Sequence, residues 1–377
     1  MPFAIDDGKI NRLIAQTGGK KYAKNILNNS RLNLKDFLAI ISVDETDKDF
    51  FEELASKAQK LTRTRFGCVK GLYIPLYLSS SCHNVCSYCG FSKNNRVKRK
   101  TLNENEIRDE LCEIYGKGFK NILLVSGELE NFKNIEYLNS AVCIAKELGF
   151  HSIGVELGAL DEPSASLLAK SGAQCFVLYQ ETYHQNSYKK THLAGQKTDY
   201  DFRIDGAERA IRSGFRQVTL GFLAGLYDPH FDSSAFYEHL HYLKKKHWDI
   251  EFSISLPRLR RAYGMDNGFE IISDVKYAQI LMGLRLAFPD APINLSTRES
   301  ARFRDGMANI CATHLSVESK TTPGGYAREV DGLEQFSVSD DRNIDELSRA
   351  LNAMGYDVHF KDWEIELNRQ NGQLEWK

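Results

Sequence analysis

The most informative stretch of this sequence is LYIPLYLSSSCHNVCSYCGF, residues 72–91. It opens with an apolar run, 72–78, whose length and composition are those of a buried strand. Three cysteines follow within eight residues, and they are Cys82, Cys86 and Cys89. In a parallel α/β barrel, the loops at the carboxyl ends of the strands build the active site. We therefore expect a first strand followed by a loop that carries three thiol ligands.

Seven further apolar runs lie along the chain, and most of them are continuously apolar rather than alternating. Strands of a parallel sheet that is covered on its outer face have this pattern. The seven runs are 122–125, 153–157, 176–179, 218–223, 252–256, 293–295 and 315–317. Helix-like stretches lie between the runs, at 103–117, 134–148, 163–171, 204–213, 233–246 and 274–287. The apolar spacing predicts an earlier amphipathic helix over roughly 47–62.

Repeated strand–helix units of this kind indicate an α/β fold with a parallel sheet. Eight strands favour a (β/α)8 TIM-type barrel. An open doubly wound sheet is the alternative, but no glycine-rich dinucleotide fingerprint follows the first strand. The alternation of strands and helices is lost after about residue 325. We therefore expect an N-terminal helical extension over 1–70, the barrel over 71–325, and a C-terminal extension over 326–377 that packs on the barrel.

The charge balance excludes some classes of partner. The 377 residues include 49 Lys plus Arg and 50 Asp plus Glu, which gives a net charge of −1. Such a chain has no general attraction to nucleic acid or to an anionic membrane. No apolar run approaches the length that spans a bilayer, and the first residues do not read as a signal peptide. We expect a cytoplasmic protein with no nucleic-acid or membrane partner.

The three clustered cysteines indicate a metal site. The other five are scattered through apolar segments, as buried cysteines commonly are, and they are Cys68, Cys112, Cys143, Cys175 and Cys311. Three soft thiolates on one short loop suit a [4Fe–4S] cluster, and three protein ligands leave one iron of the cubane free. Cys86 and Cys89 are alternatively half of a structural zinc site. A redox C-x-x-C pair is a further alternative, although its usual sequence context is absent.

The cysteine loop resembles the cluster loop of the radical S-adenosylmethionine (SAM) superfamily. Further segments resemble one branch of it, the tyrosine lyases of thiamine thiazole synthesis, which form the 2-iminoacetate synthase family. The similar segments follow the order of that family, and they are 77–102, LLVSGE (123–128), YQETYH (179–184), PRLR (257–260), LSTRES (295–300) and SKTTPGGY (319–326).

This resemblance implies a carbon–carbon lyase whose cofactors are a [4Fe–4S] cluster and SAM. The implied reaction begins with a 5′-deoxyadenosyl radical and breaks the Cα–Cβ bond of L-tyrosine. Its products are 2-iminoacetate (dehydroglycine) and p-cresol. The implied partners are thiazole synthase, in a heteromeric complex, and a flavodoxin-type reductant. The basic run Lys98–Lys100 is a candidate for steering such an acidic reductant.

Three alternatives stay open at this level. The tyrosine lyase of hydrogenase maturation shares much of the pattern, but that family is longer and carries a second cysteine cluster near its C-terminus. The last cysteine here is Cys311. A tryptophan lyase is the second alternative. An iron–sulfur protein that only transfers electrons is the third.

The resemblance also assigns residues to the cofactor. Ser126, Gly127 and Glu128 are similar to the glycine–glutamate motif that meets the amino group of the SAM methionine. Tyr88 and Phe91 flank the last cysteine and are expected near the adenine, although both are equally suited to anchoring the loop.

Three further charged residues are candidates for cofactor binding. Two of them are carboxylates within or beside apolar strands, where such a group needs a partner. Glu156 is expected to meet the ribose hydroxyls, and Glu181 the amino-acid moiety of the cofactor. Arg203 is expected to pair with the cofactor carboxylate, and a surface arginine is the alternative.

Arg298 is the leading candidate for substrate binding. It stands in Ser-Thr-Arg-Glu after the seventh strand, where a guanidinium can hold an amino-acid carboxylate through two parallel hydrogen bonds. An ion pair with Glu299 or Glu318 is the alternative. Tyr183 and His184 are candidates for contact with the phenol ring, with a structural role as the alternative.

Overall fold

The computed structural model describes residues 3–129, 133–266, 268–269, 271–330, 332 and 334–361. Its main feature is one ten-stranded sheet in the order β12-β1-β11-β10-β9-β8-β6-β5-β4-β2, with every pairing parallel. The strands are β1 (Val69–Tyr73), β2 (Pro75–Ser79), β4 (Asn121–Ser126), β5 (Ser152–Glu156), β6 (Cys175–Tyr179), β8 (Gln217–Gly221), β9 (Glu251–Ser255), β10 (Ile293–Leu295), β11 (His314–Ser316) and β12 (Asp357–His359).

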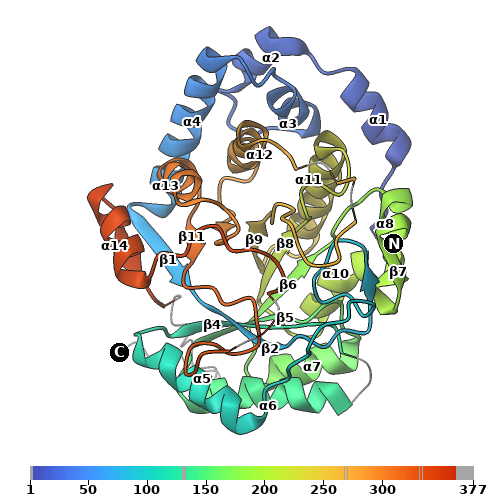
Figure 1. Ribbon diagram of the computed structural model, residues 1–377. Helices are drawn as coiled ribbons and strands as arrows, with labels where there is room; N and C mark the ends of the chain where they lie inside the picture. Colours follow the sequence, from blue (N-terminus) through green and yellow to red (C-terminus); the bar gives the residue numbers. More distant parts are fainter. Residues whose placement is uncertain are drawn as a thin grey trace.

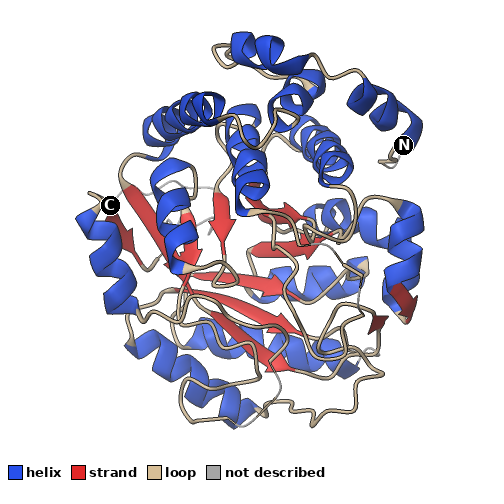
Figure 2. Ribbon diagram, turned by 45° about the horizontal axis from the view of Figure 1, so that its top comes forward, coloured by secondary structure: helices blue, strands red, loops and turns tan. Residues whose placement is uncertain are grey.

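The first strand closes the sheet on itself. Only Ile74 separates β1 from β2, yet β1 pairs with β11 while β2 pairs with β4. Backbone bonds continue the pairing on both sides of the bend, from Val317 N to Tyr73 O (3.1 Å) and from Leu123 N to Ile74 O (3.1 Å). Figure 2 shows the resulting curved sheet with helices around its outer face. The predicted barrel of parallel strands is confirmed, and each of the eight apolar runs contributes a strand.

The helices that follow the strands cover the outer face of the sheet, as Figure 1 shows. They are α5 (Glu104–Gly116), α6 (Lys133–Glu147), α7 (Glu162–Ser171), α10 (Gly206–Arg212), α11 (Pro229–Lys246), α12 (Asp274–Ala287) and α13 (Ala301–Ile310). All five residues of β2 are buried, as expected for a strand enclosed on both faces. No helix in the described ranges combines the length and apolar character needed to cross a membrane.

Four N-terminal helices form an outer layer against α11 and α12 (Figure 1), and they are α1 (Asp7–Ala15), α2 (Gly19–Ile26), α3 (Leu34–Ile41) and α4 (Lys48–Phe66). Only α4 was predicted from periodicity. Buried hydrogen bonds connect this layer to α12. Gln279 Nε2 donates to the carbonyls of Ile40 and Val43 at 2.9 Å each. Gly283 allows α3 to pack closely against α12, because a Cβ at position 283 would lie 3.1 Å from the ring of Phe37.

A segment between β6 and α10 holds the cysteine loop. It contains α8 (Gln185–Thr191), β7 (His192–Ala194), a short 3-10 turn (Gln196–Thr198) and α9 (Tyr200–Ile204), none of which was predicted. Strand β7 pairs antiparallel with β3 (Val85–Cys86), which lies inside the cysteine loop. The segment therefore gives this loop a fixed backbone conformation.

The chain beyond the barrel returns to its first strand. Helix α14 (Ile344–Ala353) is followed by β12, which pairs with β1. The extension expected over 326–377 therefore adds a strand to the sheet within its described part. Residues 362–377 lie outside the described residues.

Candidate active site

One cavity at the carboxyl ends of the strands contains most of the predicted cofactor residues, and we call it the cysteine cavity. Its empty volume is about 590 Å³. The predicted residues that line it are Cys82, Cys86, Cys89, Phe91, Ser126, Gly127, Glu128, Glu156, Glu181 and Arg203. They come from the ends of four different strands and from α9, which is how a barrel assembles a site from distant parts of the sequence.

Backbone bonds and one arginine shape the cysteine loop. The guanidinium of Arg99 donates to the carbonyls of Ser80 (2.6 Å), Phe91 (2.7 Å) and Ser92 (2.6 Å). The neighbouring Lys100 pairs with Glu106 at 3.5 Å. Arg99 and Lys100 therefore contact the protein itself, and the role of the run Lys98–Lys100 in steering a reductant stays a prediction.

The three thiols suit a group with several metal atoms. Burial raises the pKa of Cys82, Cys86 and Cys89, so their thiolate forms need a stabilising cation, and a bound metal provides one. Within the described ranges, no three His, Cys, Asp or Glu side chains converge as the ligands of a single ion would. No fourth described cysteine lines the cavity. This donor set fits an iron–sulfur cluster with one open iron better than a structural zinc ion.

Gly127 allows the second loop to approach the cysteine loop. A Cβ at this position would lie 2.2 Å from the carbonyl oxygen of Ser81 and 3.1 Å from the Cβ of Cys82. Real Cβ atoms do not come so close to backbone, so any larger residue would push the loops apart. The glycine of the Ser126–Glu128 motif therefore has a steric role at the cluster site.

Four charged residues form a network beside the cysteines, and Glu181 and Arg203 among them are buried. Arg203 donates to Glu128 (2.9 Å), to Glu181 (3.1 Å) and to the carbonyl of Tyr179 (2.8 Å). Lys197 lies 2.5 Å from the same oxygen of Glu181. Burial alone would raise the pKa of Glu181, but Lys197 and Arg203 lower it to about 2. Both carboxylates are therefore ionised, and the two positive charges balance them.

The backbone conformation of Glu181 indicates a functional constraint at this position. Its φ is 73°, in the left-handed region that non-glycine residues rarely adopt. Such conformations persist where contacts with the surrounding structure hold the residue in place, and they are concentrated at functional sites. Here the conformation places a carboxylate between Lys197 and Arg203.

Two residues of this network were missed by the sequence analysis. Lys197 and Asn84 both line the cysteine cavity. Asn84 Nδ2 donates to Glu128 at 2.7 Å, and its Oδ1 accepts from the Lys197 backbone at 3.0 Å. No spacing or strand-end position marks Lys197 in the sequence. Arg203 was predicted to meet the cofactor, but in this structure all three of its nitrogens donate hydrogen bonds to protein atoms.

A second cavity adjoins the first, and we call it the arginine cavity. Its empty volume is about 500 Å³, and it shares Val125, Glu156 and Tyr179 with the cysteine cavity. Arg298 lines it and lies over the ring of Phe336, with the guanidinium carbon 3.3 Å from the ring centroid. The guanidinium is thus held beside the space next to the cysteines.

The ion pairs considered for Arg298 are made by other residues. Glu299 accepts from Arg258 and from Arg260, the latter at 2.7 Å. Glu318 pairs with Lys117 at 2.6 Å. Both carboxylates therefore pair with other cations, and the alternative of an ion pair between Arg298 and either one is not formed.

Tyr183, His184 and Tyr88 lie outside both cavities. Tyr183 is fully buried, and its hydroxyl bonds His239 at 2.9 Å. His184 caps α8 and stacks on Tyr227 with ring centroids 3.8 Å apart. The Tyr88 hydroxyl bonds His192 at 2.8 Å. In this structure all three side chains therefore make structural contacts. The expected contacts of Tyr183 and His184 with the phenol ring are not supported.

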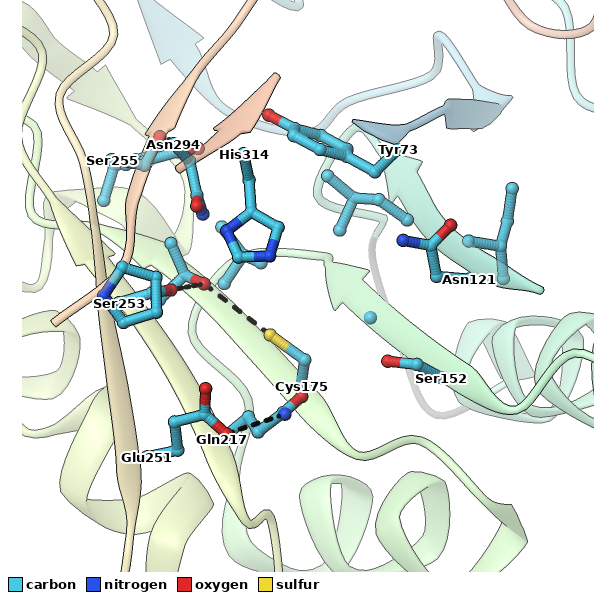
Figure 3. A pocket seen from close by; sticks show the side chains of 17 residues that line it. Tyr73, Asn121, Ser152, Cys175, Gln217, Glu251, Ser253, Ser255, Asn294 and His314 are labelled. Atoms are coloured by element: carbon cyan, nitrogen blue, oxygen red, sulfur yellow. Dashed lines mark hydrogen bonds between the residues drawn. The ribbon is translucent and has the colours of Figure 1, made fainter. Parts of the chain in front are cut away.

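A third cavity lies at the amino ends of the strands, opposite the cysteines. Figure 3 shows side chains from successive strands around it, including Asn121, Cys175, Asn294 and His314. The Oδ1 atoms of Asn121 and Asn294 are buried there without a hydrogen-bond partner. Such polar groups in a roomy cavity are commonly satisfied by water. The sequence analysis predicted no site at this end.

Known families match this chain along most of its length. The sequence pattern of the Radical SAM superfamily matches residues 76–261, and that of the Biotin and Thiamin Synthesis associated domain matches residues 255–357. The chain is 39% identical to the 2-iminoacetate synthase of Escherichia coli (strain K12) over 92% of each chain. It is 38% identical to the 2-iminoacetate synthase of Salmonella typhimurium, covering 91% of this chain and 90% of that one.

A solved structure resembles the whole fold. It is HydG, a maturase of the [FeFe]-hydrogenase, with a TM-score of 0.89 and 29% sequence identity. The match covers 94% of this chain and 80% of that chain. The agreement over nearly the full length of this chain supports the barrel and the arrangement of the segments around it.

Proposed function

The chain belongs to the radical SAM superfamily and, within it, to the 2-iminoacetate synthase family, and on this basis we propose that it cleaves the Cα–Cβ bond of L-tyrosine. The products are 2-iminoacetate and p-cresol, and the 2-iminoacetate serves thiamine thiazole synthesis. The observation that carries the proposal is the pair of adjoining cavities, one lined by three cysteines and the other by Arg298.

The family uses a [4Fe–4S] cluster and SAM, and the residues of the cysteine cavity fit both. Cys82, Cys86 and Cys89 would hold the cluster. Reductive cleavage of SAM at the cluster supplies the radical that abstracts hydrogen from the substrate. Ionised Glu128 and Glu181 offer acceptors for an ammonium group, and Lys197 offers a donor for a carboxylate. A zwitterionic amino-acid moiety needs both kinds of partner.

Arg298 holds the substrate in this proposal. Its guanidinium binds the tyrosine carboxylate, and the Phe336 ring against its face restricts its orientation. Because the two cavities share Glu156 and Tyr179, a ligand held by Arg298 lies next to the cofactor space. Holding reactants in contact is worth about 7–11 kcal/mol in favourable intramolecular systems.

A lyase of the hydrogenase-maturation kind is the alternative, because HydG shares the fold. Residues 312–377 contain no cysteine, so this part of the chain supplies no cysteine ligands for a second iron–sulfur cluster. We also propose thiazole synthase and a flavodoxin-type reductant as partners, and the cytoplasm as the compartment.

Anaerobic turnover tests the proposal directly. Reconstituted protein with dithionite, SAM and L-tyrosine is expected to form p-cresol and 5′-deoxyadenosine together, as measured by chromatography. Tryptophan in place of tyrosine is the matched control and is expected to give no indolic cleavage product. Formation of 5′-deoxyadenosine without p-cresol would exclude tyrosine cleavage.

SAM binding is expected to depend on pH through Glu156. Burial raises the pKa of its carboxyl to about 7, although Arg298 opposes this. The group is therefore protonated near pH 6 and ionised near pH 8, and the ionised form accepts hydrogen bonds from the ribose hydroxyls more strongly. We expect SAM affinity to rise several-fold between about pH 6 and about pH 8, because a one-unit pKa shift on binding corresponds to about tenfold.

Glu156→Gln provides the control, because glutamine does not titrate in this range. Its SAM affinity is expected to be weaker at pH 8 and nearly independent of pH, measured by anaerobic titration calorimetry. An equal pH dependence in the variant would show that another group is responsible.

A further inference from the structure

The segment that follows the barrel crosses the cysteine loop. A Cβ on Gly90 would lie 2.8 Å from the carbonyl oxygen of Gln335 and 3.0 Å from that of Glu334, so the two backbones are in direct contact. Gln335 N donates to the carbonyl of Thr321 at 3.0 Å, and the Thr321 hydroxyl donates to Phe336 O at 3.1 Å. These bonds fix the segment in place above the cluster site.

The side chain of Gln335 enters the cysteine cavity. Its Nε2 lies 3.8 Å from Cys89 Sγ, and its Oε1 lies 2.8 Å from the Tyr77 hydroxyl. A thiolate that ligates iron only accepts hydrogen bonds, so the NH2 end of the amide must face the sulfur. The Oε1 end then faces Tyr77, which donates.

This contact is distinctive among the contacts of the cluster cysteines. Of the described residues, Gln335 alone donates a side-chain hydrogen bond to one of the three sulfurs. Lys197 also lies in the cavity, but its ammonium is paired with Glu181. The Gln335 amide is therefore the neutral hydrogen-bond donor by which the segment after the barrel contacts a cluster cysteine.

We propose that Gln335 is a positioning residue that donates to the Cys89 thiolate and raises the reduction potential of the [4Fe–4S] cluster. Reduction adds a negative charge that is shared by the cluster sulfurs, so an N–H donor stabilises the reduced state more than the oxidised state. Hydrogen bonds to the sulfurs are one of the known determinants of such potentials. The inference rests on the cluster of the proposed function and extends it to a residue that the sequence motifs do not include.

Redox titration of the reconstituted enzyme without SAM, followed by paramagnetic resonance, tests this inference. Gln335→Leu keeps the apolar volume but removes the donor. At a fixed solution potential, we expect its ratio of reduced to oxidised cluster to fall roughly two- to tenfold, the equivalent of one ordinary hydrogen bond. Gln59→Leu, at a glutamine that bonds the Asn309 carbonyl far from the cluster, is the control and should leave the ratio unchanged.

A second pair of variants keeps the test decisive if Gln335→Leu assembles no cluster. Tyr77→Phe removes the hydroxyl that orients the amide and should lower the ratio by a smaller factor. Tyr326→Phe loses a comparable bond, to the Pro75 carbonyl at 2.7 Å, and should leave the ratio unchanged.

Two results would overturn the inference. One is an unchanged ratio in Gln335→Leu, or in Tyr77→Phe where the first variant lacks a cluster. The other is an equal change in the control variants. Failure of tyrosine cleavage in the unaltered enzyme would instead refute the proposed function, because the titration uses neither tyrosine nor SAM.

Discussion

Cys86→Ala is expected to contain no four-iron cluster and to form no detectable p-cresol. The cavity offers three thiolates and no fourth described cysteine, so loss of one leaves the cubane with two protein ligands. Cys86 is buried within the short ribbon between β3 and β7, where a replacement ligand from solvent is poorly placed to compensate. Iron and sulfide analysis of anaerobically purified protein, together with its visible absorbance, measures the effect.

Cys112→Ala is the matched control for this prediction. Cys112 is exposed on α5 and lines neither cavity, so its replacement should leave cluster content and activity unchanged. A full four-iron cluster in Cys86→Ala would refute the ligand assignment, and with it the mechanism.

Arg298→Met is expected to raise the KM for tyrosine at least about a hundredfold. Two charge-assisted hydrogen bonds to the substrate carboxylate would be lost, each typically worth about 1.5–3 kcal/mol. The side chain forms no ion pair with Glu299 or Glu318, so its replacement leaves neither carboxylate unpaired. The fold and the cluster should therefore be unaffected, and steady-state kinetics with tyrosine measures the change.

Arg298→Lys separates charge from geometry. Lysine keeps the positive charge but lacks the planar fork that binds a carboxylate through two parallel bonds. We expect an intermediate KM. SAM affinity should equal that of the unaltered enzyme in this variant, because the positive charge that lowers the pKa of Glu156 is kept. An unchanged KM for tyrosine in Arg298→Met would show that the carboxylate is held elsewhere.

The core of the site was predictable because its signals are local. Three cysteines within eight residues are recognisable as a ligand set without any tertiary information. The continuously apolar runs predicted every strand of the barrel, because burial on both faces leaves this pattern in the sequence itself. Positions such as Glu128, Glu156 and Arg298 follow such runs or end them, and a parallel barrel brings strand ends together.

Other predictions failed because a strand-end position does not determine where a side chain points. Tyr183 and His184 follow β6 as Glu181 does, yet Tyr183 turns to His239 and His184 caps α8. The positive φ of Glu181 directs its own side chain to Lys197 and Arg203 instead. Only the packing of the neighbouring helices distinguishes these outcomes.

By itself, the sequence predicted the three cysteines of the proposed cluster, the eight barrel strands and the family. The tertiary structure alone decided that Lys197 and Gln335 join the site, the latter meeting a cysteine 246 residues away in the chain. It also decided that the first strand bends to pair with both β4 and β11. The physical reason is that these contacts form only when the sheet closes, and no local preference of the residues involved encodes partners so distant in sequence.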